Sequence, residues 1–454
     1  MKIVIAGAGE VGFHLIENLS REDLDIFVID INQGVLDTLK RDYDITTDHS
    51  NITDSKYLTP SHLKDADLFL AITNSDETNM IACKIASEAG VKQTICRIRQ
   101  IDFSTTNKQF SLKSMGIDRI INPVSLMADE LYKLILTPNI VDNQDFFDGG
   151  VKLIGFKIRD YSSIVGKSIS ALEDKLRQNG FHIGIIQRTD LSIIPEPNEV
   201  IKENDTVYFL CKTSQYQALR KFLGYDRIQK KIRDIFIIGG GHMGLVLAKR
   251  LEESNQEIKV IEKRLSRSFH IAEKLQKSLV LHFDGTDLKE LKAEGIENAD
   301  HFIAITDSEQ INLSSCLIAA EQGVKRTFCL VKQPELIQII DQNTPITLGI
   351  SPRVITARYL VRFIQGADIS AYFSPFNSQI EVLEILLNAR APCLNSSIET
   401  LDLPENVKIG MIKRENRYLL PTDENVLRVG DTILLLLHRL DRERAMRVFQ
   451  QPST

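Results

Sequence analysis

The chain opens on Lys2-Ile3-Val4-Ile5-Ala6-Gly7-Ala8-Gly9-Glu10-Val11-Gly12, and this stretch decides the fold. A short apolar run leads into the pattern G-x-G-x-x-G, and helical spacing follows over Val11–Leu19. A second apolar run, Ile26–Ile29, ends at Asp30, 18 positions after the last glycine. A strand, a glycine turn, a helix and a distal acid in this order are the fingerprint of a dinucleotide-binding βαβ unit.

The same pattern returns in the second half of the chain. Gly239, Gly241 and Gly244 repeat the three glycines at an offset of 232 residues, and Glu262 repeats Asp30 at the same offset. Ala304-Ile305-Thr306 repeats Ala71-Ile72-Thr73 at an offset of 233. Because a register of this length does not arise by chance, the chain is predicted to be a tandem duplication.

Each copy divides into two parts. Short continuous apolar runs that alternate with helical patterns predict a parallel sheet buried on both faces, and shorter mixed patterns after it predict a small α+β lobe. A Pro followed by helical spacing predicts a connecting helix between the two parts, and the basic link 227–233 joins the copies. The expected fold is therefore α/β, with two tandem doubly wound Rossmann-like domains. The expected ranges are 1–121, 122–148 (helix), 149–226, 232–350, 351–376 (helix) and 377–452.

The glycine turns have a specific physical role. The first glycine makes the tight turn, the second admits a phosphate to the backbone N–H groups, and the third lets helix and strand pack closely. Asp30 and Glu262 end the second strand of each copy, where a carboxylate accepts hydrogen bonds from both ribose hydroxyls. An acid at this position repels a 2′-phosphate, which favours NAD(H) or an adenosine nucleotide over NADP.

Two further patterns follow the glycine turn. Asn74 and Glu77, like Asp307 and Gln310, have the spacing of a helix capping box at the ligand-binding edge of the sheet. Arg97 and Arg99 have strand spacing, so both side chains are expected on one face, where guanidinium groups suit phosphate oxygens. The second copy has Leu330 and Lys332 there. The two sites are therefore expected to differ, with the first binding more tightly or more selectively for polyphosphates.

Several classes of protein are disfavoured by the sequence. A formal charge of −6 gives no global attraction to nucleic acid, no apolar run reaches the length of a membrane span, and no signal peptide is recognisable. The six scattered cysteines suit a reduced, cytoplasmic setting as small buried residues. No metal motif, catalytic motif or P-loop occurs, so two nucleotide modules without catalytic groups indicate a sensor.

Together these motifs resemble the regulator-of-potassium-conductance (RCK) family over essentially the whole chain of 454 residues. The first nucleotide domain carries the resemblance in its glycine opening, in Ala71–Asn79 and in Arg97–Arg99. The lobes carry it in Val165–Ile169, Ile194–Pro197, Asn204–Tyr208, Pro421–Asn425 and Val429–Ile433. The resemblance implies RCK N domains that are each followed by an RCK C lobe. The turn after the third strand departs from the family pattern, because both copies lack its glycine and Asn51 replaces its first acid.

The resemblance also implies a function and a set of site residues. It implies a homo-oligomeric ring, a tetramer, beneath a membrane potassium channel subunit of the TrkH/TrkG type, on the inner face of the membrane. NAD(H), ATP or ADP would shift the ring between shapes and so gate the channel. The first site would comprise Gly7, Ala8, Gly9, Glu10, Val11, Gly12, Asp30, Asn51, Thr73, Asn74, Arg97 and Arg99. The second would comprise Gly239, Gly241, His242, Met243, Gly244, Glu262, Asp284 and Thr306.

Two alternatives stay open at this point. An NAD-dependent oxidoreductase with duplicated domains would reduce or oxidise a small substrate with its nicotinamide cofactor. A redox-sensing transcription factor would need a helix-turn-helix with a basic recognition helix, and the sequence shows none.

Overall fold

The computed structural model describes residues 1–20, 24–54, 63–99, 112–137, 140–188, 191–225, 234–254, 256–364, 369–375, 378–422 and 424–450. Its contacts divide the chain into two compact units. The first unit holds Met1–Ile135 and Ile232–Ile364, and the second holds Leu136–Lys231 and Gln365–Thr454. The link expected at 227–233 lies outside the described residues.

The first half of unit 1 is a doubly wound domain. Its six strands are parallel in the order β3-β2-β1-β4-β5-β6, so the order reverses between β1 and β4. Ligands of such sheets bind at the carboxyl ends of the strands beside this reversal. The strands are β1 Lys2–Ala6, β2 Asp25–Asp30, β3 Thr46–His49, β4 Leu68–Ala71, β5 Gln93–Arg97 and β6 Arg119–Ile121.

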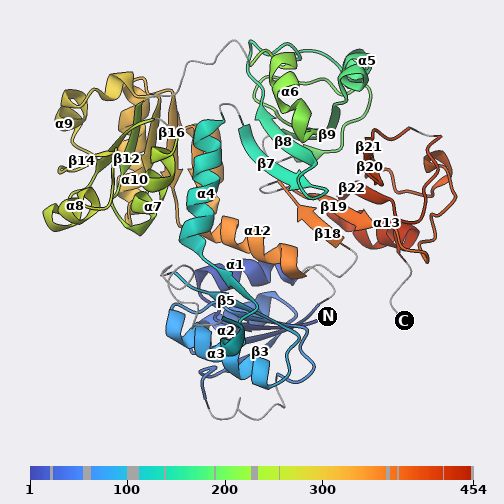
Figure 1. Cartoon of the computed structure of the whole chain (residues 1–454), viewed down its shortest axis with the longest axis horizontal. Helices are drawn as coiled ribbons and strands as arrows, with labels where there is room; N and C mark the ends of the chain where they lie inside the picture. Colours follow the sequence, from blue (N-terminus) through green and yellow to red (C-terminus); the bar gives the residue numbers. More distant parts are fainter. Residues whose placement is uncertain are drawn as a thin grey trace. The chain divides into compact units, whose positions relative to one another are not determined.

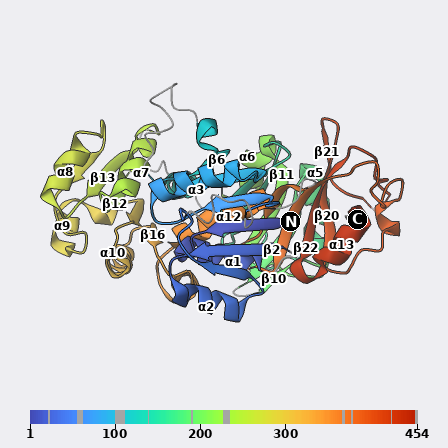
Figure 2. The same ribbon diagram turned by 90° about the horizontal axis from the view of Figure 1, so that it is seen from below.

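Helices cover both faces of this sheet (Figure 2). They are α1 Glu10–Leu19, α2 Gln33–Asp42 and α3 Asp76–Glu88, followed by the short 3₁₀ segment η2 Leu112–Met115. In α1 the buried residues Val11, Leu15 and Leu19 recur at helical spacing, which turns one face onto the sheet. In α3 the small residues Ala82, Cys83 and Ala86 do the same on the opposite face.

The second half of unit 1 repeats this domain with the order β14-β13-β12-β15-β16-β17, which confirms the duplicated α/β fold. Its strands are β12 Asp234–Ile238, β13 Glu257–Ile261, β14 Leu279–Leu281, β15 His301–Ala304, β16 Arg326–Leu330 and β17 Leu348–Ile350. Its helices are α7 His242–Glu252, α8 Leu265–Ala272, α9 Leu288–Ala293, η4 Ile296–Asn298, α10 Glu309–Glu321 and α11 Glu335–Asn343.

The two connecting helices begin at the expected prolines and pack across the halves. Helix α12, Pro352–Ile364, lies against α1 of the first half (Figure 1), and its Ala357 and Leu360 are buried in the core of the first domain. Helix α4, Pro123–Leu136, contacts the second domain in return, where Arg250 of α7 donates to its Ser125 and Asp129. Each half of the chain therefore supplies a helix to the other.

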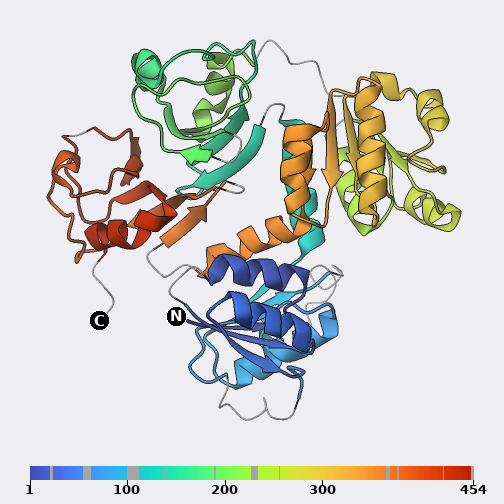
Figure 3. The same cartoon turned by 180° about the vertical axis from the view of Figure 1, so that it is seen from behind.

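Unit 2 consists of two five-stranded antiparallel sheets, in the orders β10-β9-β11-β8-β7 and β18-β19-β22-β20-β21 (Figure 3). The first lobe has β7 Ile140–Phe146, β8 Val151–Lys157, α5 Ile169–Asn179, β9 His182–Arg188, β10 Leu191–Ile193, β11 Thr206–Lys212, η3 Thr213–Gln215 and α6 Tyr216–Phe222. The second has β18 Ile369–Phe373, β19 Ile380–Leu386, η5 Ile398–Thr400, β20 Val407–Arg414, β21 Arg417–Leu419, β22 Thr432–His438, η6 Arg439–Asp441 and α13 Arg442–Phe449.

The two sheets of unit 2 share one apolar core. Tyr208 and Leu210 of the first lobe are buried in the same cluster as Leu434 and Leu436 of the second. A Cβ added to Gly184 would lie 2.6 Å from Leu436, so the bare backbone of β9 makes this close approach possible. The lobes therefore pack as a pair.

The structure corrects the two expected connecting segments. Of residues 122–148, only Pro123–Leu136 are helical, and Ile140–Phe146 form β7 of the first lobe sheet. Likewise β18, Ile369–Phe373, follows α12 within the range 351–376. Both strands lie next to a partner strand at one edge of a sheet, and polar residues break the apolar pattern in β7. Backbone pairing, which leaves little trace in the sequence, forms them.

The cysteines match the sequence expectation. All six are free thiols with buried side chains. Burial raises the pKa of the Cys211 thiol to about 12 and that of Cys393 to about 11, so both stay protonated at neutral pH. They behave as small apolar residues.

One buried histidine distinguishes the second domain from the first. His301 opens β15 and is 3% exposed, whereas Leu68 opens the equivalent strand β4. Burial lowers the pKa of His301 to about 3, and the charge of Arg326 acts in the same direction. The folded protein therefore holds this ring neutral, while the unfolded chain binds a proton near pH 6.5.

We predict that the substitution His301→Leu reduces the acid sensitivity of the protein. The unfolded wild type takes up a proton that the folded form excludes, so wild-type stability falls as pH drops from about 6.5 toward 3. At pH 5 the linkage amounts to about 2 kcal/mol, and the variant lacks it. Denaturant unfolding of both proteins between pH 7.5 and pH 5 measures the difference. Parallel stability profiles would contradict the prediction.

Candidate functional site

Two of the three glycines are required by the turn itself. Gly7 has φ +109°, and a Cβ there would lie 2.8 Å from the backbone nitrogen of Thr73. A Cβ on Gly12 would lie 2.1 Å from the carbonyl oxygen of Gly7. Gly239 and Gly244 repeat these features, with φ +111° at Gly239 and 2.0 Å between a Cβ on Gly244 and the oxygen of Gly239. Any side chain at these positions would force the strand and the helix apart.

The middle glycine of each turn is not required by the backbone geometry, unlike the other two. Gly9 has φ −64°, which any residue adopts, and the nearest atom to an added Cβ is Nδ2 of Asn74 at 4.0 Å. Gly241 is alike, with φ −66° and Nη1 of Arg267 at 4.0 Å. In the described part of the chain, neither the backbone nor a neighbour demands glycine here. The missing side chain leaves space directly above the start of a helix.

The helix starts beneath this space carry no side-chain cap. Gly9 precedes α1 and Gly241 precedes α7, and neither offers an oxygen to the first N–H groups. The first intrahelical bonds run from Phe13 to Gly9 and from Leu245 to Gly241. N–H groups at an uncapped helix start, together with the positive end of the helix dipole, form an anion site. The arrangement can hold a phosphate in each half.

The acids expected to bind ribose lie against the glycine turns. Asp30 accepts from the backbone N–H of Ala8 through Oδ2 at 2.6 Å and from Asn32 through Oδ1 at 2.8 Å. Glu262 accepts from Gly240 through Oε2 at 3.0 Å and from Arg264 through Oε1 at 2.8 Å. Each acid therefore also fixes the turn to the end of the second strand, a role that spacing alone did not reveal.

A buried asparagine organises the loop after β4. Oδ1 of Asn79 accepts from the N–H and hydroxyl of Thr73 at 2.8 and 2.7 Å, and Nδ2 donates to the carbonyl of Arg97 at 2.9 Å. Asn79 is 0% exposed. In the second half Asn312 makes the same bonds to Thr306 and Leu330. In the sequence these asparagines show only as a repeated position at the offset of 233 residues, which does not reveal this role.

The helix cap in this loop lies one residue later than the expected capping box. Ser75, not Asn74, caps α3, and its hydroxyl accepts from the N–H of Thr78 at 3.1 Å. Ser308 caps α10 in the same way, in place of Asp307. Asn74 is thereby left free of the cap and faces Gly9. A side-chain cap is therefore present at the start of both helices, but it begins one residue after the position that the sequence pattern predicts.

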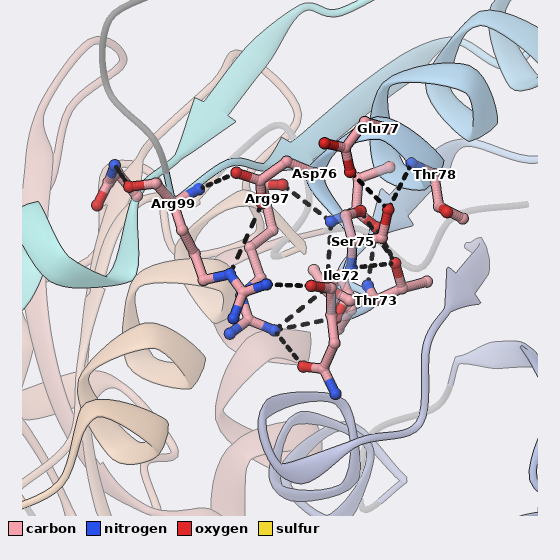
Figure 4. A network of polar contacts seen from close by, with 11 residues as sticks. Ile72, Thr73, Ser75, Asp76, Glu77, Thr78, Arg97 and Arg99 are labelled. Carbon is pink, nitrogen blue, oxygen red and sulfur yellow. Dashed lines mark hydrogen bonds and ion pairs between the residues drawn. The ribbon is translucent and has the colours of Figure 1, made fainter. Parts of the chain in front are cut away.

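The two arginines do meet beside this loop, as their strand spacing predicts (Figure 4). Nη1 of Arg97 lies 3.3 Å from the carbonyl of Thr73 and 3.4 Å from Oδ1 of Asn74. Arg99 donates to the carbonyl of Asn74 and lies 3.7 Å from Asp76. Burial lowers the pKa of Arg97 from an ordinary value far above neutrality. The pair thus fixes the loop that faces the first glycine turn.

The turn after the third strand is a polar loop in both halves. Oδ1 of Asn51 accepts from the N–H and hydroxyl of Thr53 at 3.0 and 2.9 Å. Asp284 does the same for Thr286 and binds Lys263 through Oδ2 at 2.7 Å. Hydrogen bonds from Lys263 and Thr286 lower the pKa of Asp284 to about 2. Asn51 therefore replaces the acid without changing the turn.

The residues between the glycines divide into buried and exposed. Ala8 and Val11 are buried, Met243 is half-buried, and Glu10 and His242 are exposed. Glu10 forms a paired contact with Arg353 of α12, with Nε 3.0 Å from Oε2 and Nη2 2.5 Å from Oε1. The first glycine turn is therefore tied to a helix from the other half of the chain, which no sequence pattern indicated.

Comparison with known proteins identifies the family. The TrkA-N domain matches residues 3–123 and 235–352, and the TrkA-C domain matches residues 153–224 and 382–450. The chain belongs to the TrkA family. The Trk system potassium uptake protein TrkA of Halomonas elongata is 30% identical over 448 residues, which cover 98% of this chain and 97% of that protein. The protein of the same name from Haemophilus influenzae is 30% identical over 458 residues, covering 100% and 99%.

A solved structure agrees on the fold. The structure described as the GsuK channel bound to NAD aligns with a TM-score of 0.63 over 99% of this chain and 78% of that one, at 18% identity. The TrkA family is regulatory and non-enzymatic, which confirms the expectation from the missing catalytic motifs and overturns the oxidoreductase alternative. The tandem order of TrkA-N and TrkA-C domains confirms the duplication.

We predict that Asn79→Ala destabilises unit 1 by about 2–5 kcal/mol. The substitution leaves the N–H of Thr73 and the carbonyl of Arg97 buried without their partner, and each such group costs about 1–3 kcal/mol. Chemical unfolding of the full chain measures the loss. Asn312→Ala is the matched variant and is expected to cost a similar amount, within about 1 kcal/mol. A loss below about 0.5 kcal/mol for Asn79→Ala would show that the network is dispensable.

Proposed function

We propose that this chain is the regulatory subunit of a Trk-type potassium uptake system. It binds adenine nucleotides at its glycine turns, and the bound nucleotide shifts the conformation of a homo-oligomeric ring, a tetramer. The ring lies in the cytoplasm against a membrane channel subunit of the TrkH/TrkG type and gates it. No helix in the described part of the chain is long and apolar enough to cross a bilayer. In this proposal, contact with the membrane is made through the channel subunit.

The space above Gly9 carries the proposal. This glycine has an ordinary φ and room for a Cβ, yet it stands over an uncapped helix start. Because the backbone does not require glycine here, the effect of the missing side chain is to leave room for a ligand. A phosphate fits, because the helix offers unpaired N–H groups and a positive dipole end.

The kind of nucleotide follows from the surroundings and from a relative. Asp30 is partly exposed at the end of β2, beside the turn, where it suits a ribose edge. The GsuK channel, which shares the fold, is described as bound to NAD. We therefore assign NAD(H) to the first site, with ATP and ADP as the other adenine nucleotides that the same phosphate cradle admits.

Occupancy can be transmitted through Glu10. Its carboxylate follows Gly9 directly and pairs with Arg353 of α12. A phosphate above the helix start competes with this carboxylate for the positive charge nearby, so binding and the position of α12 are coupled. Because a ligand moves an equilibrium only as far as it binds the two shapes differently, gating requires about 5.5 kcal/mol of differential binding summed over the ring.

We predict that Gly9→Ser weakens nucleotide binding without unfolding the protein. Serine fits the backbone, and its hydroxyl caps α1, so the thermal midpoint is expected to stay equal or rise slightly. The same hydroxyl takes the N–H groups that a phosphate needs, and we expect at least a tenfold loss of affinity for NADH by calorimetry. Gly241→Ser is the matched variant for the second site. Unchanged NADH affinity in both variants would contradict the proposal that the glycine turns bind the phosphates of the nucleotide.

The physiological prediction concerns potassium uptake. In cells that lack this chain, we expect slow potassium uptake, restored by the wild type and not by Gly9→Ser at equal protein level. Copurification with the membrane subunit is expected for both, since the substitution lies inside the nucleotide domain. Undiminished uptake in the deletion strain would refute the proposed function.

A further inference from the structure

A shallow hollow of about 360 Å³ lies beside the second glycine turn. It is lined by Arg264, which precedes α8, by Ser266 and Arg267 in the first turn of α8, and by His270 in its last turn. Nη1 of Arg267 lies 4.0 Å from the place where a Cβ on Gly241 would be. The guanidinium therefore flanks the space above the uncapped start of α7.

Of the neighbouring cations, Lys263 is engaged in a hydrogen-bonded ion pair, whereas the side chain of Arg264 only lies near an acid. Lys263 binds Asp284 at 2.7 Å, and Nε of Arg264 lies 3.6 Å from Oε1 of Glu262. Within the described ranges, no ion pair is found for the side chains of Arg267 and His270. The hollow thus presents at least one positive charge that the protein leaves uncompensated.

The first half has nothing comparable at these positions. At the offset of 232 residues, Arg264, Arg267 and His270 correspond to Asn32, Val35 and Thr38. The loop after β15 differs in the opposite sense. Asp307 stands where the first half has Asn74, and it adds a negative charge to this loop. The cations of α8 therefore distinguish the second site from the first, in addition to the loss of the arginine pair at Leu330 and Lys332.

The acid of the second half is turned inward. Glu262 is 6% exposed, and both of its oxygens accept backbone N–H groups. Asp30 makes the equivalent two bonds but is partly exposed, so it is the deeper burial of Glu262 that leaves its charge less available to a ligand. The repulsion of an additional phosphate, which the sequence led us to expect in both halves, is weaker here.

We propose that the second glycine turn selects an adenine nucleotide with an additional phosphate, which Arg264 and Arg267 hold. This inference rests on the proposed nucleotide-binding function and specifies its second site. It reverses the expectation, drawn from Arg97 and Arg99, that the first site is the more selective for polyphosphates. The phosphate has two sources, the 2′-phosphate of NADPH or the terminal phosphates of ADP and ATP. A planar guanidinium pairs with either, because it offers parallel N–H donors to phosphate oxygens.

Calorimetry on the full-length Gly9→Ser variant tests this proposal. Because this substitution is expected to weaken binding at the first site, the measured affinities then report on the second site. We expect NADPH to bind more tightly than NADH, or ATP more tightly than AMP, and the pair that differs identifies the source of the phosphate. Adding Arg264→Gln and Arg267→Gln is expected to lower the affinity for the preferred ligand about 10- to 100-fold. The affinities for NADH and AMP are expected to change less than about threefold. Arg41→Gln on α2, where Arg41 is exposed and paired with Asp42, is the matched control.

Three results would overturn the proposal. The first is equal affinity for NADH and NADPH together with equal affinity for AMP and ATP. The second is a preference that survives the double arginine substitution. The third is that the Gly9→Ser chain binds none of these ligands although the wild type does. If the wild-type chain itself bound no adenine nucleotide, the proposed function would fail instead.

Discussion

The candidate site depends on one close contact. Gly12 lies so near the carbonyl oxygen of Gly7 that no Cβ fits between them. This contact brings α1 close against β1 and aims the helix start at the point where the strand order reverses. Asp30 then fixes the turn from one side, and the loop ordered by Asn79 closes it from the other. The N–H groups left at the helix start are a consequence of this packing, and an anion is their natural partner.

Much of this frame is readable from the sequence, because glycine spacing and apolar runs report directly on backbone geometry and burial. The strand that ends at Asp30 and the helices that begin at Pro123 and Pro352 follow in that way. Contacts between distant residues do not leave such a pattern. The strand Ile140–Phe146 depends on backbone pairing, and the contact of Glu10 with Arg353 joins residues 343 positions apart. Only the folded chain brings these groups together.

The two halves keep the same frame and change the charges around it. Asn79 and Asn312 make identical bonds, so the loop after the fourth strand keeps its shape in both. The side chains that face a ligand are less constrained by packing, and here the halves diverge, with arginines on β5 and its following loop in the first and on α8 in the second. A duplicated fold can thus preserve backbone architecture while its two sites acquire different ligands.

The placement of α12 limits how the first half of the chain could fold by itself. Ala357 and Leu360 complete the core of the first domain, although they belong to the second half of the chain. A shortened chain ending before them would leave an apolar groove along α1 open to water. Such a fragment would have to recruit the equivalent helix of another copy to close it, which makes the full-length chain resemble a dimer whose two members have been fused into one polypeptide.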